Sequence, residues 1–127
     1  MNEEKYTQKA LSALQEAQNT ALADSHQEIK EEHLLSALLG DNGLISGLLT
    51  KNSVDIAALK RETDAYLESL PQVSGSGSNV YIGNELAKVL AVAEKLAKEN
   101  GDGFIGVEHL FIAMLKNPSA FAKDLFR

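Results

Sequence analysis

Cysteine and tryptophan are absent from this chain of 127 residues, and proline occurs only twice. Without cysteine there is no disulfide, no thiolate nucleophile and no cysteine-bound zinc, a composition that suits a reducing cytosol. Aromatic residues make up 6% of the chain, against 44% hydrophobic residues among which alanine and leucine dominate. Because alanine and leucine favour helix over strand, the composition predicts an all-α protein.

Long apolar runs and an excess of basic residues are also lacking. No apolar stretch approaches the ~20 residues that span a bilayer, and the polar, acidic start MNEEKYTQ cannot be a signal peptide. Twelve basic against 18 acidic residues give a formal net charge of −6, which argues against nucleic acid and anionic membranes as partners. We expect a single cytoplasmic domain over residues 1–127, large enough to bury a core.

Apolar residues recur at helical spacing in six segments. The first runs from Tyr6 to Leu22, with Thr7 as its N-cap. Five more helices are expected, at Glu31–Leu39, Leu44–Lys51, Asp55 to about Leu70, Asn84 to about Asn100, and Val107 to about Lys116. Pro118 is expected to open a final segment. Residues 71–79, PQVSGSGSN, have the composition of a flexible connector.

The chain repeats itself at an offset of 76 residues. Residues 5–51 align with 81–127 without a gap, and Glu-His-Leu opens an apolar helix in both copies. We therefore predict a duplicated four-helix unit, with unit one over residues 5–70 and unit two over residues 80–127. Unit two has no counterpart of the helix that ends near Leu70, so we expect it to be truncated by its last helix, as in a piece of a longer protein.

The repeated Glu-His pairs admit a metal site. Glu32, His33, Glu108 and His109 would supply two carboxylates and two imidazoles, as in a metal-dependent enzyme. Adjacent residues on a helix point about 100° apart, however, so the two members of one pair do not share a face. We favour structural roles, with each carboxylate at the positive end of a helix and each imidazole packed and hydrogen-bonded. His26, in a loop, is expected to be solvated.

Other motifs argue against chemistry in this chain. GDGFIG, residues 101–106, matches the dinucleotide-binding fingerprint in spelling, but it follows a helix where that motif follows a strand. Neither a P-loop sequence nor G-x-S-x-G occurs. We expect no enzymatic activity, no cofactor and no metal.

The two units differ at positions that are polar in unit one and apolar in unit two. The pairs are Glu16/Val92, Thr20/Leu96, Glu28/Phe104, Glu31/Val107 and Ser36/Ile112. If the units fold alike and the polar members are exposed, their apolar counterparts are exposed as well. Val92 and Leu96 share one helix face and Phe104 lies in the loop that follows, so the three are expected to form one side of an apolar groove. The alternative is that they are buried where the units meet.

The chain resembles, over essentially its whole length, the N-terminal domain of Clp ATPases, specifically of the ClpB disaggregase type. The resemblance is carried by the helices EEHLLSALL and VEHLFIAML, by the connector LPQVSGSGS and by the regularly spaced alanines of the first helix of each unit. The resemblance implies an eight-helix pseudo-twofold domain, monomeric in isolation and tethered to a hexameric motor that carries the ATP site. It implies capture of exposed hydrophobic segments of unfolded or aggregated polypeptides in the apolar groove. It also implies functional polar residues at Thr7, Asp102 and Glu108, whose structural roles would be N-cap, turn former and helix-dipole partner.

A neighbouring role within the same resemblance stays open. N-terminal domains of protease-associated Clp ATPases bind adaptors or phosphoarginine-marked substrates through glutamates that open both Glu-His-Leu helices. Glu32 and Glu108 match those positions in this sequence. The connector favours the ClpB type.

Overall fold

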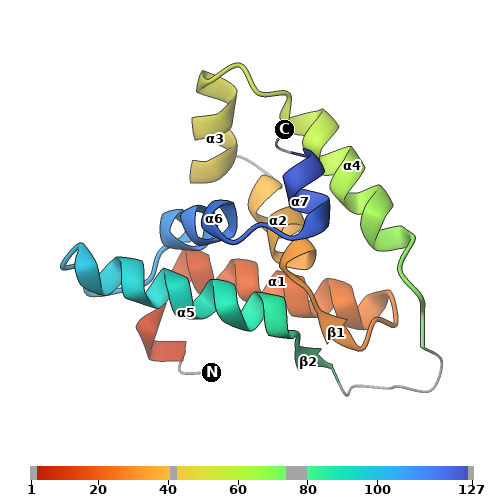
Figure 1. Cartoon of the computed structure of the whole chain (residues 1–127), viewed down its shortest axis with the longest axis horizontal. Coiled ribbons are helices and arrows are strands. Elements are labelled where there is room, and N and C mark those ends of the chain that lie inside the picture. The colour runs from red at the N-terminus through yellow and green to blue at the C-terminus, as the bar shows by residue number, and fades with distance from the viewer. Residues whose placement is uncertain (1–2, 41–42, 74–79, 126–127) are drawn as a thin grey trace.

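The computed structural model describes residues 3–40, 43–73 and 80–125, which fold into helices with one minimal sheet (Figure 1). A 3₁₀ turn, Glu3–Lys5, precedes the helices α1 Gln8–Ala23, α2 Glu31–Leu39, α3 Leu44–Lys51, α4 Ile56–Glu68, α5 Asn84–Glu99, α6 Val107–Lys116 and α7 Ala120–Leu125. Strands β1 Glu28–Ile29 and β2 Tyr81–Ile82 pair in parallel. The all-α prediction is confirmed, and the six expected helices begin and end within two residues of their predicted bounds. Most of the expected connector, residues 74–79, lies outside the described residues.

The structure repeats at the offset seen in the sequence. Adding 76 to the bounds of α1 reproduces those of α5, and the same shift carries the starts of α2 and α3 onto those of α6 and α7. Ile29 pairs with Ile82, and their counterparts Ile105 and Tyr6 also pair. Reciprocal pairing of this kind is what a twofold relation produces. The backbones of the two units therefore pair with each other at two places.

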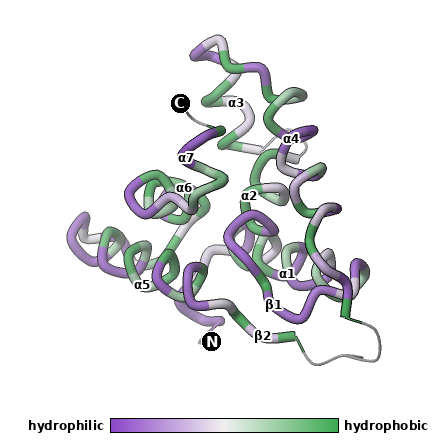
Figure 2. Tube along the Cα trace, turned by 45° about the vertical axis from the view of Figure 1, so that its right-hand side comes forward, coloured by the Kyte–Doolittle hydropathy of each residue, from purple (hydrophilic) through white to green (hydrophobic). Residues whose placement is uncertain are grey.

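One continuous core joins the two units. Figure 2 shows α1, α4 and α5 alternating between hydrophobic and hydrophilic residues, as helices with one buried face do. On α1 the buried stripe is Ala10, Leu14, Ala17 and Ala21, and on α5 it is Leu86, Val89, Ala93 and Ala97. The small alanines of α1 let α2 pack closely against it, and those of α5 do the same for α6. Each fully buried leucine contributes about 1.5–3 kcal/mol to the stability of the fold. Within the described residues, no helix has the length and apolar character needed to cross a bilayer.

The turns after α1 and α5 share one geometry. Ser25 has φ +59° and Gly101 has φ +74°, both in the left-handed region. The N–H of the next residue, His26 or Asp102, then donates to the carbonyl five residues earlier at 2.8 Å. Such a turn ends a helix by satisfying its last carbonyls. Glycine adopts this conformation without strain, whereas a residue with a Cβ does so at a cost of about 1–2 kcal/mol.

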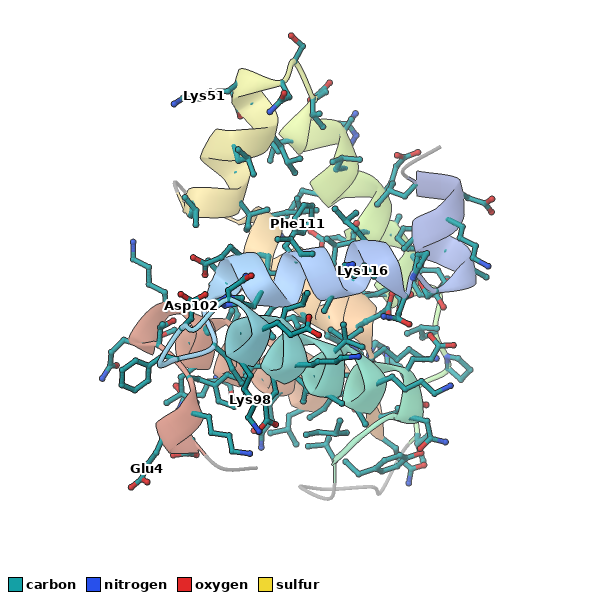
Figure 3. The ribbon with its side chains drawn as sticks, turned by 60° about the vertical axis from the view of Figure 1, so that its left-hand side comes forward. Glu4, Lys51, Lys98, Asp102, Phe111 and Lys116 are labelled. Carbon is teal, nitrogen blue, oxygen red and sulfur yellow. The ribbon has the colours of Figure 1, made fainter. Side chains whose placement is uncertain are left out.

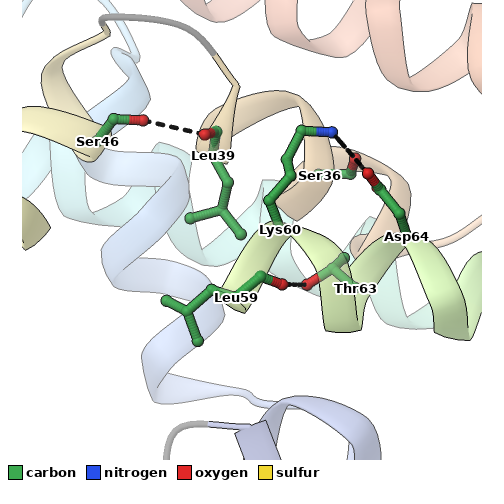
Figure 4. Close-up of polar contacts among 7 residues, drawn as sticks. All are labelled: Ser36, Leu39, Ser46, Leu59, Lys60, Thr63 and Asp64. Atoms are coloured by element: carbon green, nitrogen blue, oxygen red, sulfur yellow. Dashed lines mark hydrogen bonds and ion pairs between the residues drawn. The ribbon is translucent and has the colours of Figure 1, made fainter. Parts of the chain in front are cut away.

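Helix α4 covers the outer face of α2 (Figure 4). The Ser36 hydroxyl donates to Asp64 at 2.6 Å, and the Lys60 ammonium lies 3.0 Å from both Ser36 Oγ and Asp64 Oδ2. Ser36 is therefore buried, at 8% exposure, and the assumption that the polar residues of unit one are exposed is wrong there. Its counterpart Ile112 is 42% exposed, because no helix in the described part of the chain covers α6 as α4 covers α2.

Candidate functional site

The loop between α5 and α6 gathers four of the six predicted site residues. Asp102 and Phe104 lie on the loop itself, and Glu108 lies in the first turn of the helix that follows. The Thr7 N–H donates to the Ile105 carbonyl at 3.0 Å, so the start of α1 lies beside the loop. The Thr7 hydroxyl accepts a hydrogen bond from Ala10 N–H at 3.1 Å, which confirms its predicted role as an N-cap.

A hollow of about 270 Å³ opens beside this loop and is here called the unit-two hollow. Its apolar lining is Ala97, Phe104 and Ile105, and its polar lining is Lys5, Glu94, Lys98, Asp102 and Gly103. Figure 3 shows Asp102 on the loop and Lys98 near the end of α5. Phe104 is 58% exposed, a large fraction for an aromatic ring. The unit-two hollow thus combines apolar surface with charged groups at its edge.

Charged side chains at this edge form one network. Lys5 Nζ lies 2.9 Å from Glu94 Oε2, and Lys98 Nζ lies 3.5 Å from the same oxygen. The hydrogen bond from Lys5 lowers the pKa of the Glu94 carboxyl, so this group stays ionised in neutral solution. Lys5 and Glu94 are not among the site residues predicted from the sequence, because they are 89 positions apart and only the fold brings them together.

Val92 and Leu96 occupy a different environment from Phe104. Both are half-buried and pack against the core. Neither lines the unit-two hollow. The structure therefore brings Phe104 and Asp102 together at one open site and places Val92 and Leu96 partly in the protein interior.

Asp102 is held in place by the buried imidazole of His109. The Gly106 N–H donates to His109 Nδ1 at 2.9 Å, so the ring hydrogen is on Nε2, which donates to Asp102 Oδ2 at 2.8 Å. Glu108 is exposed, and its Oε1 lies 3.8 Å from His109 Nδ1. Its carboxylate lies over Gly106, where an added Cβ would collide with it. The imidazole thus orients an exposed carboxylate at the edge of the unit-two hollow.

In unit one the equivalent carboxylate is replaced by a second imidazole. The Lys30 N–H donates to His33 Nδ1 at 2.9 Å, and His33 Nε2 donates in turn to His26 Nδ1 at 3.0 Å. The predicted structural role of His33 and His109 is confirmed. The expectation that His26 is solvated is wrong, because the turn after α1 folds its ring against His33, leaving it 4% exposed. Burial, with a smaller contribution from His26, lowers the pKa of His33 to about 4.

Glu31 and Glu32 bind the N-terminus of α7. Glu31 Oε1 accepts the Ser119 N–H at 2.9 Å, and Glu32 Oε2 accepts the Ser119 hydroxyl at 2.5 Å. Both glutamates are 2% exposed, so the assumption that Glu31 is exposed is wrong. Burial, with a smaller contribution from the neighbouring charge of Glu32, raises the pKa of Glu31 to about 7. Glu32 is therefore occupied within the protein, which leaves Glu108 as the exposed member of the pair proposed for phosphoarginine.

The two Glu-His pairs do not converge on a metal site. In the part of the chain that the structure describes, no three histidine, aspartate or glutamate side chains are arranged to hold a metal ion. Both ring nitrogens of His33 form hydrogen bonds with other groups of the protein, and so do both ring nitrogens of His109. This geometry gives no support to a metal-dependent enzyme.

Another hollow, of about 260 Å³, lies between α1, α2 and α3. Its apolar lining is Ala13, Ala37, Leu38, Leu44, Ile45 and Val107. Leu44 and Leu48, one turn apart on α3, are 52% and 50% exposed. No comparison of the two units pointed to this surface, because their counterparts Ala120 and Asp124 are not larger apolar residues.

The chain resembles known proteins along nearly its whole length. Residues 5–127 match the family model described as the Clp repeat (R) N-terminal domain. The chaperone protein ClpB of Mesorhizobium japonicum is 36% identical over 126 residues, covering 98% of this chain and 14% of that protein. ClpB of Rhizobium meliloti is 40% identical over 121 residues, covering 94% of this chain and 14% of that protein. The chain thus spans about one seventh of the length of these relatives.

Solved structures show the same fold at lower sequence identity. The Hsp104 N-terminal domain from Candida albicans superposes with a TM-score of 0.88 at 19% identity, covering 96% of this chain and 79% of that one. The N-terminal domain of the ClpV1 ATPase from E. coli gives a TM-score of 0.82 at 24% identity, covering 98% and 72%. The family model matches residues 5–127, and two ClpB relatives are 36% and 40% identical over nearly the whole chain. The chain therefore belongs to the Clp repeat N-terminal domain family.

Proposed function

We propose that this chain is the substrate-binding domain of an ATP-dependent protein disaggregase, acting in the cytoplasm on exposed hydrophobic segments of unfolded or aggregated proteins. The observation that supports this most is Phe104, an aromatic ring that is 58% exposed at the edge of the unit-two hollow. Exposed aromatic surface beside a concave apolar lining is typical of sites that bind apolar side chains. The hydrolysis of ATP belongs to the remainder of such a protein.

The binding is expected to be weak and tolerant of sequence. Burying one or two apolar side chains yields about 1.5–3 kcal/mol each, from which the cost of ordering the bound segment is subtracted. Weak contacts suit a domain that must release its substrate to a motor. Several copies on one oligomeric ring would raise the overall affinity by increasing the local concentration of sites.

The polar residues of the site have supporting roles in this proposal. Asp102, held by His109, and the exposed Glu108 border the apolar surface and are available to backbone amides or basic side chains of a substrate. Thr7 contributes through the backbone, because its N–H fixes the position of Ile105 in the hollow. Val92 and Leu96 support the site from the core side.

Binding of a disordered protein such as casein tests the proposal. Phe104→Ala removes exposed ring surface without touching the core and should weaken binding by about fivefold to thirtyfold, the equivalent of ~1–2 kcal/mol. Leu48→Ala is the matched control, since Leu48 is exposed to a similar extent on α3. Equal affinities for the wild type and Phe104→Ala, both folded by circular dichroism, would remove the unit-two hollow from the proposal.

A further inference from the structure

The turn between α1 and β1 binds both ends of the connector that joins unit one to unit two. Val73 N–H donates to the Ser25 carbonyl at 2.9 Å, and Tyr81 N–H donates to the Gln27 carbonyl at 3.0 Å. Val73 belongs to the connector, and Tyr81 opens β2 just beyond its other end. The turn follows the end of α1 and lies close to β2 (Figure 1). The residue between the two acceptors is His26.

A pair of buried imidazoles fixes this turn. His26 is 4% exposed and His33 is 1% exposed, with 3.0 Å between His26 Nδ1 and His33 Nε2. His33 Nδ1 already accepts the Lys30 N–H, so the ring hydrogen of His33 is on Nε2 and is donated to His26 Nδ1. The ring hydrogen of His26 is then on Nε2, which has no hydrogen-bond partner within the described residues.

An additional proton has no place in this arrangement. A neutral imidazole takes up a proton at its unprotonated nitrogen, which is Nδ1 in both rings. This nitrogen of His26 already accepts from His33, and that of His33 already accepts from Lys30. Protonation of either ring would point two hydrogens at each other and would place a charge in the interior. Burial and the neighbouring His26 lower the pKa of His33 to about 4, in agreement with this geometry.

The groups around the pair give little compensation for an added charge. The charged and titratable groups that lie nearest come from the end of α1, β1, the start of α2 and β2, and they are Asp24, Glu28, Lys30 and Tyr81. Asp24 favours a positive charge on His33, whereas Lys30 opposes it. The Glu28 carboxylate lies over Gly83, at the start of α5. The segment after α4 contributes Leu70 and Pro71 beside His26, and both are uncharged.

Unit two has a carboxylate at the equivalent position. Asp102 replaces His26 at the offset of 76, and its Oδ2 accepts the Nε2 hydrogen of His109 at 2.8 Å. Carboxylic acids in proteins are mostly ionised at pH 5, whereas imidazoles generally take up protons between pH 5 and pH 8. A change from pH 7.5 to pH 5 should therefore act on the pair in unit one and spare the pair in unit two.

We infer that the His26–His33 pair is a pH-sensitive switch that releases the connector from unit one in mild acid. Protonation separates the two rings, the turn between α1 and β1 opens, and its backbone hydrogen bonds to Val73 and Tyr81 are lost. The change is local, because the packed faces of the helices do not take part in it. The inference does not depend on the proposed function, since neither imidazole lines the unit-two hollow.

Amide hydrogen exchange of the ¹⁵N-labelled chain tests the inference, with protection factors corrected for the intrinsic effect of pH. The amides of Val73 and Tyr81, here called the connector amides, report on the two bonds that the switch releases. An imidazole that is neutral when buried and titrates normally when exposed lowers protection by up to about tenfold per pH unit below 6.5. We expect protection of the connector amides to fall about tenfold to thirtyfold from pH 7.5 to pH 5. Protection at residues 102–109 should change much less.

Two substitutions at His26 separate titration from packing. His26→Asn keeps an oxygen that accepts the His33 hydrogen but takes up no proton, and His26→Asp copies unit two. In both variants the connector amides should be almost equally protected at pH 7.5 and pH 5. Asp102→His is the converse variant, and it should give residues 102–109 the pH dependence of unit one.

Three results would overturn the inference. They are unchanged protection of the connector amides between pH 7.5 and pH 5, an equal loss of protection at residues 102–109, or a pH dependence in His26→Asn as large as in the wild type. If neither His26 variant folds, Asp102→His decides, because unchanged protection at residues 102–109 in that variant would also contradict the inference. Long-range ¹H–¹⁵N spectra of the imidazoles give an independent check, since His33 must carry its hydrogen on Nε2 at pH 7.5.

Discussion

Replacing Glu31 by glutamine should stabilise this protein above neutral pH. Glu31 is 2% exposed at the start of α2, and its Oε2 has no hydrogen-bond partner within the described residues. Burial raises its pKa from 4.5 to about 7. Because the folded state prefers the protonated form, stability is retained in acid, falls as the pH rises from 4.5 through 7, and then stays low. Glutamine is neutral throughout and keeps an oxygen for the Ser119 N–H.

The size of the effect follows from the pKa difference. The rise of the Glu31 pKa from 4.5 to about 7, at about 1.4 kcal/mol per pH unit, sets an upper limit of about 3 kcal/mol. Ionised Glu31 also forms a stronger hydrogen bond with Ser119 than glutamine can, which offsets part of this gain. We expect Glu31→Gln to add about 1–2 kcal/mol at pH 8.5 and to raise Tm by about 3–8 °C.

Thermal unfolding followed by circular dichroism at pH 4.5 and pH 8.5 measures this effect. The difference between Glu31→Gln and the wild type should be small at pH 4.5 and large at pH 8.5. Glu62→Gln is the matched control, because Glu62 is an exposed glutamate on α4 and should change Tm little at either pH. A constant difference between Glu31→Gln and the wild type at both pH values would show that the Glu31 carboxyl does not titrate near neutrality, and the reasoning would fail.

Three further predictions concern other contacts of the fold. Burial lowers the pKa of His33 to about 4, so the folded state favours the neutral imidazole and loses stability as the pH falls from 6.5 towards 4. Urea unfolding should therefore show a smaller difference in the free energy of unfolding between pH 5 and pH 7 for His33→Gln than for the wild type. Ser119→Ala leaves the buried Glu32 carboxylate without its hydroxyl donor and the Ala122 N–H without its acceptor, and should cost about 1–3 kcal/mol, measured by urea unfolding at pH 7. Gly101→Ala forces a Cβ into φ +74° and should lower stability by about 1–2 kcal/mol, whereas Ser25→Gly, at the counterpart turn, should not lower it.

The helices and the duplication were accessible from the sequence because both depend on local patterns. The alanines and leucines of α1 and α5 recur every three or four residues, and the Glu-His-Leu starts carry the same local hydrogen bond from the N-cap amide to the imidazole. Thr7 was recognised as an N-cap for the same reason, since its partner is three residues away. Interactions between residues three or four positions apart can be predicted from short stretches of the sequence.

The open site was only partly accessible. Comparing the two units singled out Phe104, which is exposed, but the same comparison assumed that the polar members of each pair are exposed. Ser36 and Glu31 contradict that assumption, because α4 covers the first and the start of α7 covers the second. A difference between repeats shows that two environments differ, and it does not show which of them is open to solvent.

The sequence by itself determined the helix positions, the repeat, the absence of cysteine chemistry and the family resemblance. Each of these depends only on the composition or on patterns within short stretches of the chain. Only the tertiary structure decided which side chains meet across long separations. The Ser119 hydroxyl donates to Glu32, which is 87 positions away in the sequence. The Val73 N–H donates to the Ser25 carbonyl, and helices α2, α3 and α4 lie between the two in the sequence. Burial depends on which distant segment packs against a residue, so the exposure of Phe104 on unit two follows only from the folded arrangement of both units.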